Sequence, residues 1–361
     1  MSTAFHGSDL EKIEKVFGVK KEDIVNFAAN VNPYGFSKKA AEALKNRLDV
    51  ISSYPDPAYS ELKKSISLYT GANVENIILG NGVTELLTLF LNVLSPKKAV
   101  VIGPTYSEYE KDLKRLGAEI VHIDAKEEND FVLTGSFLAE QTPEDADLVI
   151  LCNPNNPTSG ALYKKDIIKL ANAYQKNNTH LLIDETYIEF SKVAKDITAT
   201  DVTNDFTNVH VLRGTSKFFA TPGLRLGYAL TKNEKVLAEV VRTQDPWNIN
   251  SVAELVGTVM FLDEEYITFV RESMDQEKDY FCKELSQING AKIYPVNGNI
   301  ILVRLPEHGP DSETLFVELI KKGMMIRDCS SFEQLGNRFI RICFMGHEDN
   351  VRLVETIKKY Y

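Results

Sequence analysis

Four short polar segments carry residues whose types and spacing could do chemistry, and each follows an apolar run. In chain order they are residues 80–85, 153–158, 184–187 and 215–219. The first opens an apolar helical stretch, so its free backbone N–H groups and the helix dipole can hold a phosphate. In the second, two prolines fix the backbone around asparagines whose amides both donate and accept hydrogen bonds.

The third and fourth segments supply an acid and an amine. Asp184 places a carboxylate at the end of an apolar run, with the Tyr187 phenol three residues on, and Lys217 is flanked by hydroxyl residues and two phenylalanines. Partial desolvation lowers the pKa of a lysine and makes its amine a usable nucleophile. Each segment alone also fits a structural role as a turn, a helix cap or a surface loop, but together they indicate more than any one of them.

The elements that must position these segments alternate between about residues 76 and 230. Strands are expected at 76–79, 99–102, 119–123, 148–152, 181–184 and 209–213, and helices at 83–94, 108–116 and 164–176. This alternation predicts βαβ units around a mostly parallel, buried sheet. Ligands of such sheets bind at the carboxyl ends of the strands, which is where the four polar segments stand.

The pattern changes after about residue 251 to that of a smaller α+β domain. Helices are expected at 264–285, at 312–322 and from 348, and strands at 299–305 and 339–343. The only plausible linker lies near residues 245–247. The chain therefore divides into a large α/β part and a smaller companion, as a length of 361 residues allows at about 150 residues per domain.

Composition excludes several classes of protein. Lys and Arg number 41 against 51 Asp and Glu, a net charge of −10 that disfavours binding to a nucleic acid. The longest strongly apolar stretch, residues 86–94, is far shorter than the roughly 18 residues of a membrane span. The first ten residues have no secretory pattern, so a cytoplasmic location is expected. The 4 cysteines contain no C-x-x-C pair, which favours reduced thiols and predicts no metal site.

In their order and spacing, the N-P-x-N-P-T, D-E-x-Y and S-K-x7-R segments resemble the fold-type I pyridoxal-phosphate enzymes, the aminotransferase class I/II superfamily. The resemblance covers nearly the whole chain. It implies an α/β, aspartate aminotransferase-like fold with a mostly parallel sheet in the large domain. It also implies an N-terminal arm of residues 1–45 that contributes to the small domain, a large cofactor-binding domain of residues 46–250 and a small C-terminal domain of residues 251–361.

The resemblance assigns contacts to pyridoxal 5′-phosphate. It implies that Lys217 forms the Schiff base with the cofactor aldehyde and that Asp184 pairs with the pyridine nitrogen. It further implies that Asn156 and Tyr187 bond the 3-hydroxyl and that Tyr106 stacks on the ring. A carboxylate about 4 Å from a pyridinium stabilises it by about 4 kcal/mol at an effective dielectric near 20. Lys217, Asp184 and Tyr187 are thus the predicted catalytic residues.

The phosphate of the cofactor has its own predicted set of residues. By the same resemblance it is held by Asn81, Gly82, Val83, Ser216 and Arg225. Tyr54 matches the tyrosine that reaches the phosphate of the neighbouring subunit, which implies a homodimer with shared active sites. Two positions depart from the family pattern. Gly214 stands where relatives usually carry Ser or Thr, and Ser159 stands where the usual N-P-T-G segment has glycine.

Three segments at the substrate end, residues 6–10, 26–33 and 246–250, resemble threonine-phosphate decarboxylase, a cobalamin-pathway relative of histidinol-phosphate aminotransferase. By that resemblance Arg341 binds the substrate carboxylate, while His6, Asn32 and Arg327 lie around the substrate phosphate. The charge argument is consistent, because an acidic protein needs locally placed guanidinium groups to capture an amino acid that carries two anionic groups.

The sequence thus predicts a pyridoxal-phosphate enzyme that acts on a small phosphorylated amino acid. Decarboxylation of L-threonine O-phosphate, or of a close analogue such as phosphoserine, is favoured over transamination. The alternative is an aminotransferase of the histidinol-phosphate type that transfers the amino group to 2-oxoglutarate, and a remote one is a non-catalytic cofactor-binding homologue. The two reactions differ in which bond of the substrate Cα stands perpendicular to the ring plane, so both stay open.

Overall fold

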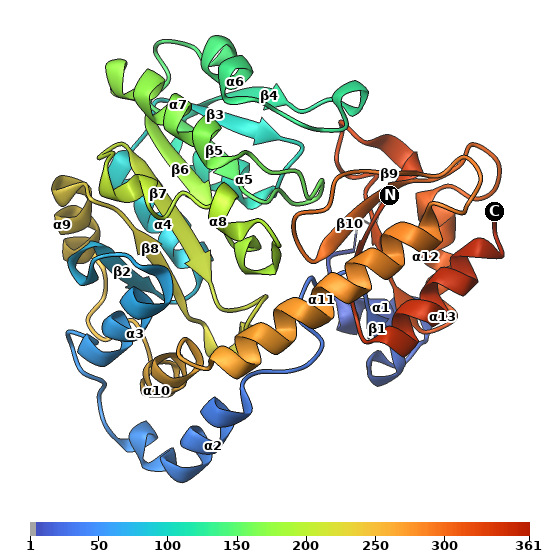
Figure 1. Cartoon of the computed structure of the whole chain (residues 1–361), viewed down its shortest axis with the longest axis horizontal. Helices are drawn as coiled ribbons and strands as arrows, with labels where there is room; N and C mark the ends of the chain where they lie inside the picture. The colour runs from blue at the N-terminus through green and yellow to red at the C-terminus, as the bar shows by residue number, and fades with distance from the viewer. Residues whose placement is uncertain (1–4) are drawn as a thin grey trace.

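The computed structural model describes residues 5–361, which form two separate sheets and a small two-stranded pairing (Figure 1). The large sheet has the strand order β2-β8-β7-β6-β5-β3-β4. Its strands are β2 (Ile77–Gly80), β3 (Lys98–Gly103), β4 (Glu119–Asp124), β5 (Leu148–Cys152), β6 (His180–Asp184), β7 (Val209–Gly214) and β8 (Gly227–Leu230). Only β8 runs antiparallel to its neighbours, so the predicted mostly parallel sheet is confirmed.

The sequence pattern predicted some of the helices beside the large sheet and missed others. These helices are α4 (Val83–Leu94), α5 (Glu108–Leu116), α6 (Gly135–Gln141), α7 (Lys164–Lys176), α8 (Ala194–Ile197) and α9 (Glu234–Thr243). The predicted bounds of α4, α5 and α7 are confirmed, whereas α6, α8 and α9 were missed. Local chemistry explains one of these ends: Gly117 adopts the left-handed conformation that terminates α5. Every residue of β5 is buried, which accounts for its continuous apolar run.

The small sheet is antiparallel and lies at the other end of the long helix α11 (Glu264–Leu285), which runs diagonally across Figure 1. Its strands are β12 (Arg327–Asp328), β13 (Phe339–Cys343), β10 (Ile300–Arg304) and β9 (Lys292–Ile293), with α12 (Ser312–Ile320) and α13 (His347–Lys358) alongside. The predictions for α11 and β13 are confirmed, and those for β10, α12 and α13 are right to within two residues.

The N-terminal part of the described chain lies with the small sheet. Helix α1 (Leu10–Phe17) leads to β1 (Val25–Asn26), which pairs in parallel with β11 (Met324–Met325). Helix α10 (Ser251–Met260) instead packs against α2 (Lys38–Asn46) and α3 (Ser60–Thr70). We therefore propose that the boundary between the two parts falls in α11 rather than at residue 250. Residues 1–4 of the predicted arm lie outside the described residues.

Two further predictions can be compared with the structure. Cys152, Cys282, Cys329 and Cys343 are all free, as the spacing indicated. Within residues 5–361, no helix is both long enough and apolar enough to cross a lipid bilayer.

Candidate active site

The polar segments of the sequence meet at one edge of the large sheet. Strands β5, β6 and β7 are neighbours and run parallel, so the residues that follow them lie side by side. Asp184 ends β6 and faces Cys152 at the end of β5. Lys217 lies three residues beyond the end of β7. The topology alone therefore brings the predicted acid, amide and amine together at the carboxyl edge.

Lys217 reaches away from the sheet toward the N-terminal part of the chain. Its Nζ donates a hydrogen bond to the Ala29 carbonyl oxygen at 2.7 Å. Burial, with a smaller effect from the nearby Arg341 guanidinium, lowers the pKa of Lys217 from 10.5 to about 8. Near neutral pH a useful fraction of this amine is consequently uncharged and nucleophilic.

Asp184 is a buried carboxylate that is held from both sides. Its Oδ1 accepts hydrogen bonds from the Thr186 N–H at 2.9 Å and the Thr186 hydroxyl at 2.5 Å, and its Oδ2 accepts one from the Tyr109 hydroxyl at 2.7 Å. Burial raises the pKa of Asp184, and these three donors oppose that rise by favouring the ionised form. A carboxylate fixed in this way can pair with a protonated ring nitrogen.

Tyr109 is a functional candidate that sequence reasoning missed. It lies on α5, three residues after the predicted stacking residue Tyr106, and their rings meet edge to face at 5.6 Å. Tyr106 precedes the helix, so helical spacing gave no signal for this contact. Tyr106 itself is 39% exposed, whereas Tyr109 is fully buried beneath it.

The predicted residues around the 3-hydroxyl connect the large sheet to the small one. Arg341 Nη1 donates to Asn156 Oδ1 at 2.5 Å, and its Nη2 donates to the Ala28 carbonyl at 2.8 Å. The Tyr187 hydroxyl accepts a hydrogen bond from Asn30 Nδ2 at 3.1 Å. Burial raises the pKa of Tyr187, so the phenol keeps its proton and can donate it to a ligand oxygen. Asn30 was not singled out from the sequence.

The predicted phosphate residues form a cradle at the start of α4. Arg225 Nη2 donates to the Asn81 carbonyl at 3.2 Å, and a Cβ on Gly82 would lie 2.5 Å from that nitrogen. Gly82 has a φ of 86°, which other residues rarely adopt. The first N–H groups of α4, beginning at Val83, have no acceptor within the helix. A guanidinium above a helix N-terminus fits a phosphate group, and Ser216 lies two residues beyond the end of β7.

Gly214 is explained by the same cradle. A Cβ at this position would lie 2.7 Å from Val83 Cγ2, so a Ser or Thr side chain would press on the first residue of α4. Glycine here allows β7 to approach the helix closely.

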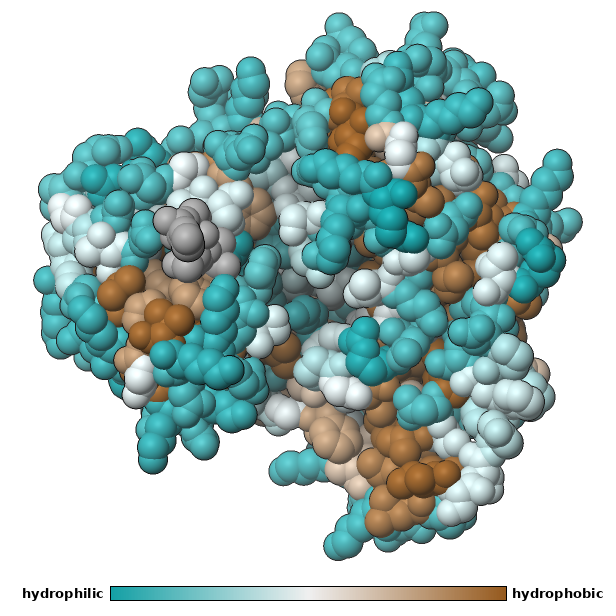
Figure 2. All heavy atoms as spheres, turned by 180° about the vertical axis from the view of Figure 1, so that it is seen from behind, coloured by the Kyte–Doolittle hydropathy of each residue, from teal (hydrophilic) through white to brown (hydrophobic). Residues whose placement is uncertain are grey.

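Tyr54 is not brought into hydrogen bonding with these residues. It is 79% exposed, and its ring lies 4.6 Å from that of Trp247. Seen from behind, the surface has an apolar region at the lower right, where the segment after α2 lies (Figure 2). Leu48 and Ile51 of that segment are 57% and 67% exposed.

The substrate end is dominated by two arginines that face each other directly. Arg327 on β12 and Arg341 on β13 are cross-strand partners, and both are buried. Arg327 Nη1 donates to the Phe5 carbonyl at 2.5 Å and its Nη2 to the Ser331 hydroxyl at 2.7 Å. Within residues 5–361, neither guanidinium has a carboxylate at ion-pair distance, although Arg213 elsewhere in the chain is paired with Glu185.

His6 lies close enough to these arginines to be affected by their charge, whereas the contacts of Asn32 are with other segments. The His6 side chain is exposed, and partial burial together with the positive charge of Arg327 lowers its pKa. The Asn32 amide nitrogen donates to the Phe218 carbonyl and the Tyr266 hydroxyl, each at 2.9 Å. The Asn32 side chain thus connects the loop at Phe218 to helix α11 at Tyr266. Its backbone N–H donates to the Lys217 carbonyl at 3.0 Å.

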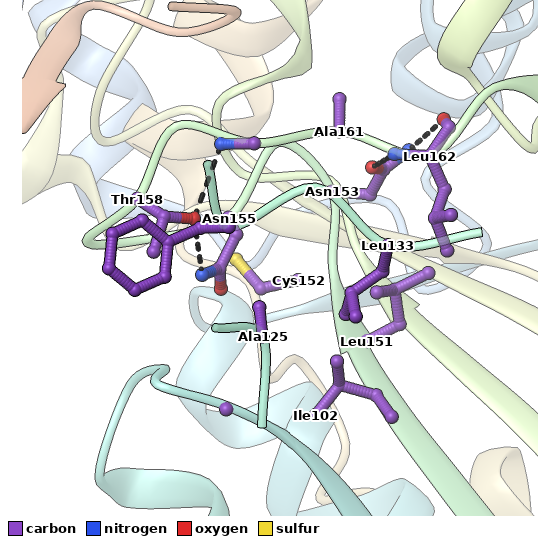
Figure 3. Close-up of a pocket in the computed structure, with 13 residues that line it drawn as sticks. Ile102, Ala125, Leu133, Leu151, Cys152, Asn153, Asn155, Thr158, Ala161 and Leu162 are labelled. Atoms are coloured by element: carbon purple, nitrogen blue, oxygen red, sulfur yellow. Dashed lines mark hydrogen bonds between the residues drawn. The ribbon is translucent and has the colours of Figure 1, made fainter. Parts of the chain in front are cut away.

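Asparagine side chains of the loop after β5 form hydrogen bonds within that loop and stabilise it (Figure 3). Asn155 Nδ2 donates to the Thr158 hydroxyl at 2.9 Å, and Asn153 Oδ1 accepts from the Leu162 N–H at 2.7 Å. The cavity behind this loop has a volume of about 30 Å³ and a mostly apolar lining. That volume suits one or two waters but no amino acid, so the cavity is not the substrate site.

Comparison with known proteins identifies the family. Residues 22–357 match the family model of aminotransferase class I and II. The chain belongs to the aminotransferase class I and II family. It is 30% identical over 354 residues to the threonine-phosphate decarboxylase of Salmonella typhimurium, an alignment that covers 98% of this chain and 95% of the relative. It is 29% identical over 356 residues to the histidinol-phosphate aminotransferase of Methanococcus aeolicus, covering 98% and 94%.

The solved structures agree with this family assignment. The histidinol-phosphate aminotransferase from Clostridium acetobutylicum superposes with a TM-score of 0.85 at 28% identity, over 92% of this chain and 98% of that one. As a class I/II aminotransferase family member, the protein has the aspartate aminotransferase-like fold and is a pyridoxal-phosphate-dependent enzyme. The family, fold and cofactor predicted from the sequence are confirmed.

Proposed function

We propose that this enzyme decarboxylates a small phosphorylated amino acid, with L-threonine O-phosphate or a close analogue such as phosphoserine as substrate. The observation that carries this proposal is the pair of buried guanidiniums, Arg327 and Arg341, which face each other without an acidic partner in the described chain. Burying a charge without a counter-charge is costly, so the pair calls for an anionic ligand.

The geometry of the pair favours a ligand with two anionic groups. Directly opposed residues on antiparallel strands have Cβ atoms only about 5 Å apart, so one small molecule can reach both guanidiniums. In this proposal Arg341 exchanges the Asn156 amide for the substrate carboxylate. Arg327 and His6 then bind the substrate phosphate, with Asn32 bracing the segment beside them.

The cofactor residues proposed from the sequence fit the arrangement described above. They are Tyr54 from the neighbouring subunit together with Asn81, Gly82, Val83, Tyr106, Asn156, Asp184, Tyr187, Ser216, Lys217 and Arg225. The fit rests on the Arg225 guanidinium over the start of α4 and on the lowered pKa of Lys217. Bound there, pyridoxal 5′-phosphate supplies an aldehyde that captures the amino group and a ring that accepts the electron pair of the broken bond.

Two residues of this chain, Asp184 and Lys217, are proposed to control protonation during the reaction. The Asp184 carboxylate would stabilise a positive charge on the ring nitrogen, and its three donors favour the ionised form against the effect of burial. Lys217 is the residue that would hold the cofactor aldehyde, and its Nζ would be the group that gives a proton to, or takes one from, the substrate Cα. Its pKa near 8 suits a group that both gives and takes a proton.

A histidinol-phosphate type of aminotransferase is the second candidate. One observation favours it: relatives named histidinol-phosphate aminotransferase reach 33% identity to this chain, within the 30% to 35% of the relatives named for threonine-phosphate decarboxylation. The amino acceptor 2-oxoglutarate also carries two anionic groups, so the same arginine pair could hold it.

We also propose that the enzyme is a homodimer. The exposed ring of Tyr54 and the exposed apolar side chains of Leu48 and Ile51 lie near each other in sequence on one surface segment. A second copy that covers this segment would bury them and bring Tyr54 to the partner's phosphate cradle. The cytoplasmic location stays a prediction from the sequence.

The deciding experiment follows the absorption of the bound cofactor when the enzyme meets excess O-phospho-L-threonine without any 2-oxo acid, with products identified by mass spectrometry. A decarboxylase returns the starting absorption band while amine and carbon dioxide accumulate over many turnovers. An aminotransferase converts its cofactor once to the amine form and stops until a 2-oxo acid is added. A spectrum that does not respond would overturn the substrate assignment.

A further inference from the structure

Ser159 occupies the position at which the family's N-P-T-G segment has glycine. Its φ is 58°, in the left-handed region that favours glycine. The side chain is also fully buried at the junction between the loop after β5 and the small sheet. A non-glycine residue retained in an unfavourable backbone conformation indicates that its side chain makes a contact of value there.

The contacts of Ser159 join the two parts of the molecule. Its hydroxyl oxygen accepts hydrogen bonds from the Asn297 N–H at 3.0 Å and the Gly298 N–H at 2.9 Å. Its carbonyl oxygen accepts a further one from Asn297 Nδ2 at 3.0 Å. Asn297 and Gly298 directly precede β10 of the small sheet, so the hydroxyl ties that sheet to the loop that carries Asn156.

The same segment also contacts the N-terminal stretch whose Ala29 carbonyl accepts a hydrogen bond from Lys217. Asn299 Nδ2 donates to the Asn30 carbonyl at 3.0 Å, and Asn30 Nδ2 donates to the Tyr187 hydroxyl. A Cβ at Gly298 would lie only 3.5 Å from the Tyr187 Cβ. Segment 297–299 is therefore packed against the candidate catalytic residues, and its position depends directly on Ser159.

A second tie between the same two parts is the hydrogen bond from Arg341 to Asn156. Under the proposed function, that bond is given up when the substrate carboxylate binds Arg341 and the cofactor binds Asn156. The Ser159 contacts use no group that either ligand needs, so they persist through binding.

We propose that Ser159 is a positioning residue, which keeps the small sheet docked on the loop after β5 while Arg341 exchanges Asn156 for the substrate. The docking itself is independent of the substrate's identity, but its effect on catalysis rests on the proposed function. Without the hydroxyl, the Arg341 guanidinium would be less well placed for the substrate carboxylate, and binding would weaken more than turnover.

The direct test measures hydrogen exchange at the Gly298 amide in the cofactor-loaded enzyme. Ser159→Gly relaxes the backbone and removes the hydroxyl, and Ser159→Ala removes the hydroxyl alone. Both variants should speed exchange in the peptide that covers residues 295–300 by about three- to tenfold, which is the range expected for one hydrogen bond. Unchanged exchange in both variants would overturn the proposal.

Kinetics then separate positioning from general stability. The KM for the amino substrate should rise about three- to tenfold in both variants, with kcat within twofold of the parent enzyme. Asn178→Gly is the matched control, because Asn178 is exposed with the same φ of 58° and lies outside the site. A fall in kcat at unchanged KM would contradict the positioning role. If phosphothreonine is not turned over by the parent enzyme, the proposed substrate fails while the exchange result still decides the role of Ser159.

Discussion

The cofactor end and the substrate end of this site are built in opposite ways. The cofactor end gathers residues that follow adjacent strands of one sheet, and its buried acid, Asp184, has three hydrogen-bond donors of its own. The substrate end gathers Arg327 and Arg341 from the small sheet with segments near the N-terminus, and both cations lack an acidic partner within residues 5–361. At the cofactor end, the buried acid has its hydrogen-bond partners before a ligand binds. At the substrate end, the two guanidiniums would gain their anionic partner only from the ligand.

This difference suggests separate roles for the two ends, one in the chemical step and the other in substrate binding. A carboxylate that already has its hydrogen-bond donors keeps its position when a ligand binds, so Asp184 is pre-organised for the role proposed for it. A buried cation held only by neutral groups such as the Phe5 and Ala28 carbonyls gains from any anion that replaces them. Changes at the cofactor end should therefore act on kcat, and changes at the substrate end on KM.

The strongest test of the cofactor end is Asp184→Asn. The amide cannot hold a positive charge on the ring nitrogen, so kcat should fall about 1,000-fold, which corresponds to the roughly 4 kcal/mol of one close charge pair. The cofactor should still bind, because the cradle at Arg225 is untouched. Steady-state kinetics and the absorption of the bound cofactor check both points, and a variant with near-parental kcat would remove Asp184 from its role.

The pH dependence of Lys217 tests the link between the two ends. Burial disfavours the charged amine, so the pKa is lowered and the neutral form dominates above about pH 8 rather than above 10.5. In enzyme freed of its cofactor, the rate of covalent capture of pyridoxal 5′-phosphate should thus rise with pH to a plateau with a midpoint near 8. Because the Arg341 guanidinium contributes to this lowering, Arg341→Gln should raise the midpoint. A midpoint near 10.5 in the parent enzyme would show that the amine is not desolvated.

Arg341→Gln also tests the substrate end directly. Removal of the guanidinium eliminates a charge-assisted contact to the substrate carboxylate, so KM should rise by about 100-fold with a smaller change in kcat. Arg304→Gln is a suitable control, since Arg304 is a partly exposed arginine of the neighbouring strand β10 that is paired with Glu307. An equal effect of the two substitutions would argue against a dedicated carboxylate site at Arg341.

Tyr109→Phe is expected to have an intermediate effect on the cofactor end. It removes one donor to Asp184 while it keeps the ring, so the pKa of Asp184 should rise further and kcat should fall about tenfold. The activity loss should be largest at low pH, where the carboxylate is protonated first. Tyr174→Phe provides the comparison, because Tyr174 is also buried but bonds Thr142 away from the site. A flat pH profile in Tyr109→Phe would contradict the proposed support of the carboxylate.

Gly7→Ala should have the smallest effect and concerns the packing against residues 28 and 29, whose carbonyls accept hydrogen bonds from Arg341 and Lys217. A Cβ at Gly7 would lie 2.5 Å from the Ala28 carbonyl oxygen, so the N-terminal segment could not pack as closely beside Arg341. We expect KM to rise about threefold, as for the loss of one hydrogen bond, with faster proteolysis within the first ten residues. Addition of O-phospho-L-threonine should protect that segment in the parent enzyme. Unchanged cleavage in the variant would show that the close approach is unimportant.

Much of the fold was predictable because its determinants are local. The bounds of α4, α5 and β5 follow from apolar periodicity and from turn residues that lie next to them in the chain. The positions of the four polar segments, each directly after an apolar run, also indicated a site at the carboxyl edge of the sheet. Strand β8 was missed, since its short run carries little periodicity and its direction depends on pairing with β2 and β7.

By itself, the sequence determined the family and the cofactor, and it predicted the reactive amine and its acid, because these depend on residue types in a fixed order along the chain. Only the tertiary structure decided that Tyr109 supports Asp184, that Ser159 ties the two sheets and that Arg327 faces Arg341. These contacts join residues up to 139 positions apart, as between Ser159 and Gly298. Such pairs are set by packing and strand register, which no local pattern encodes.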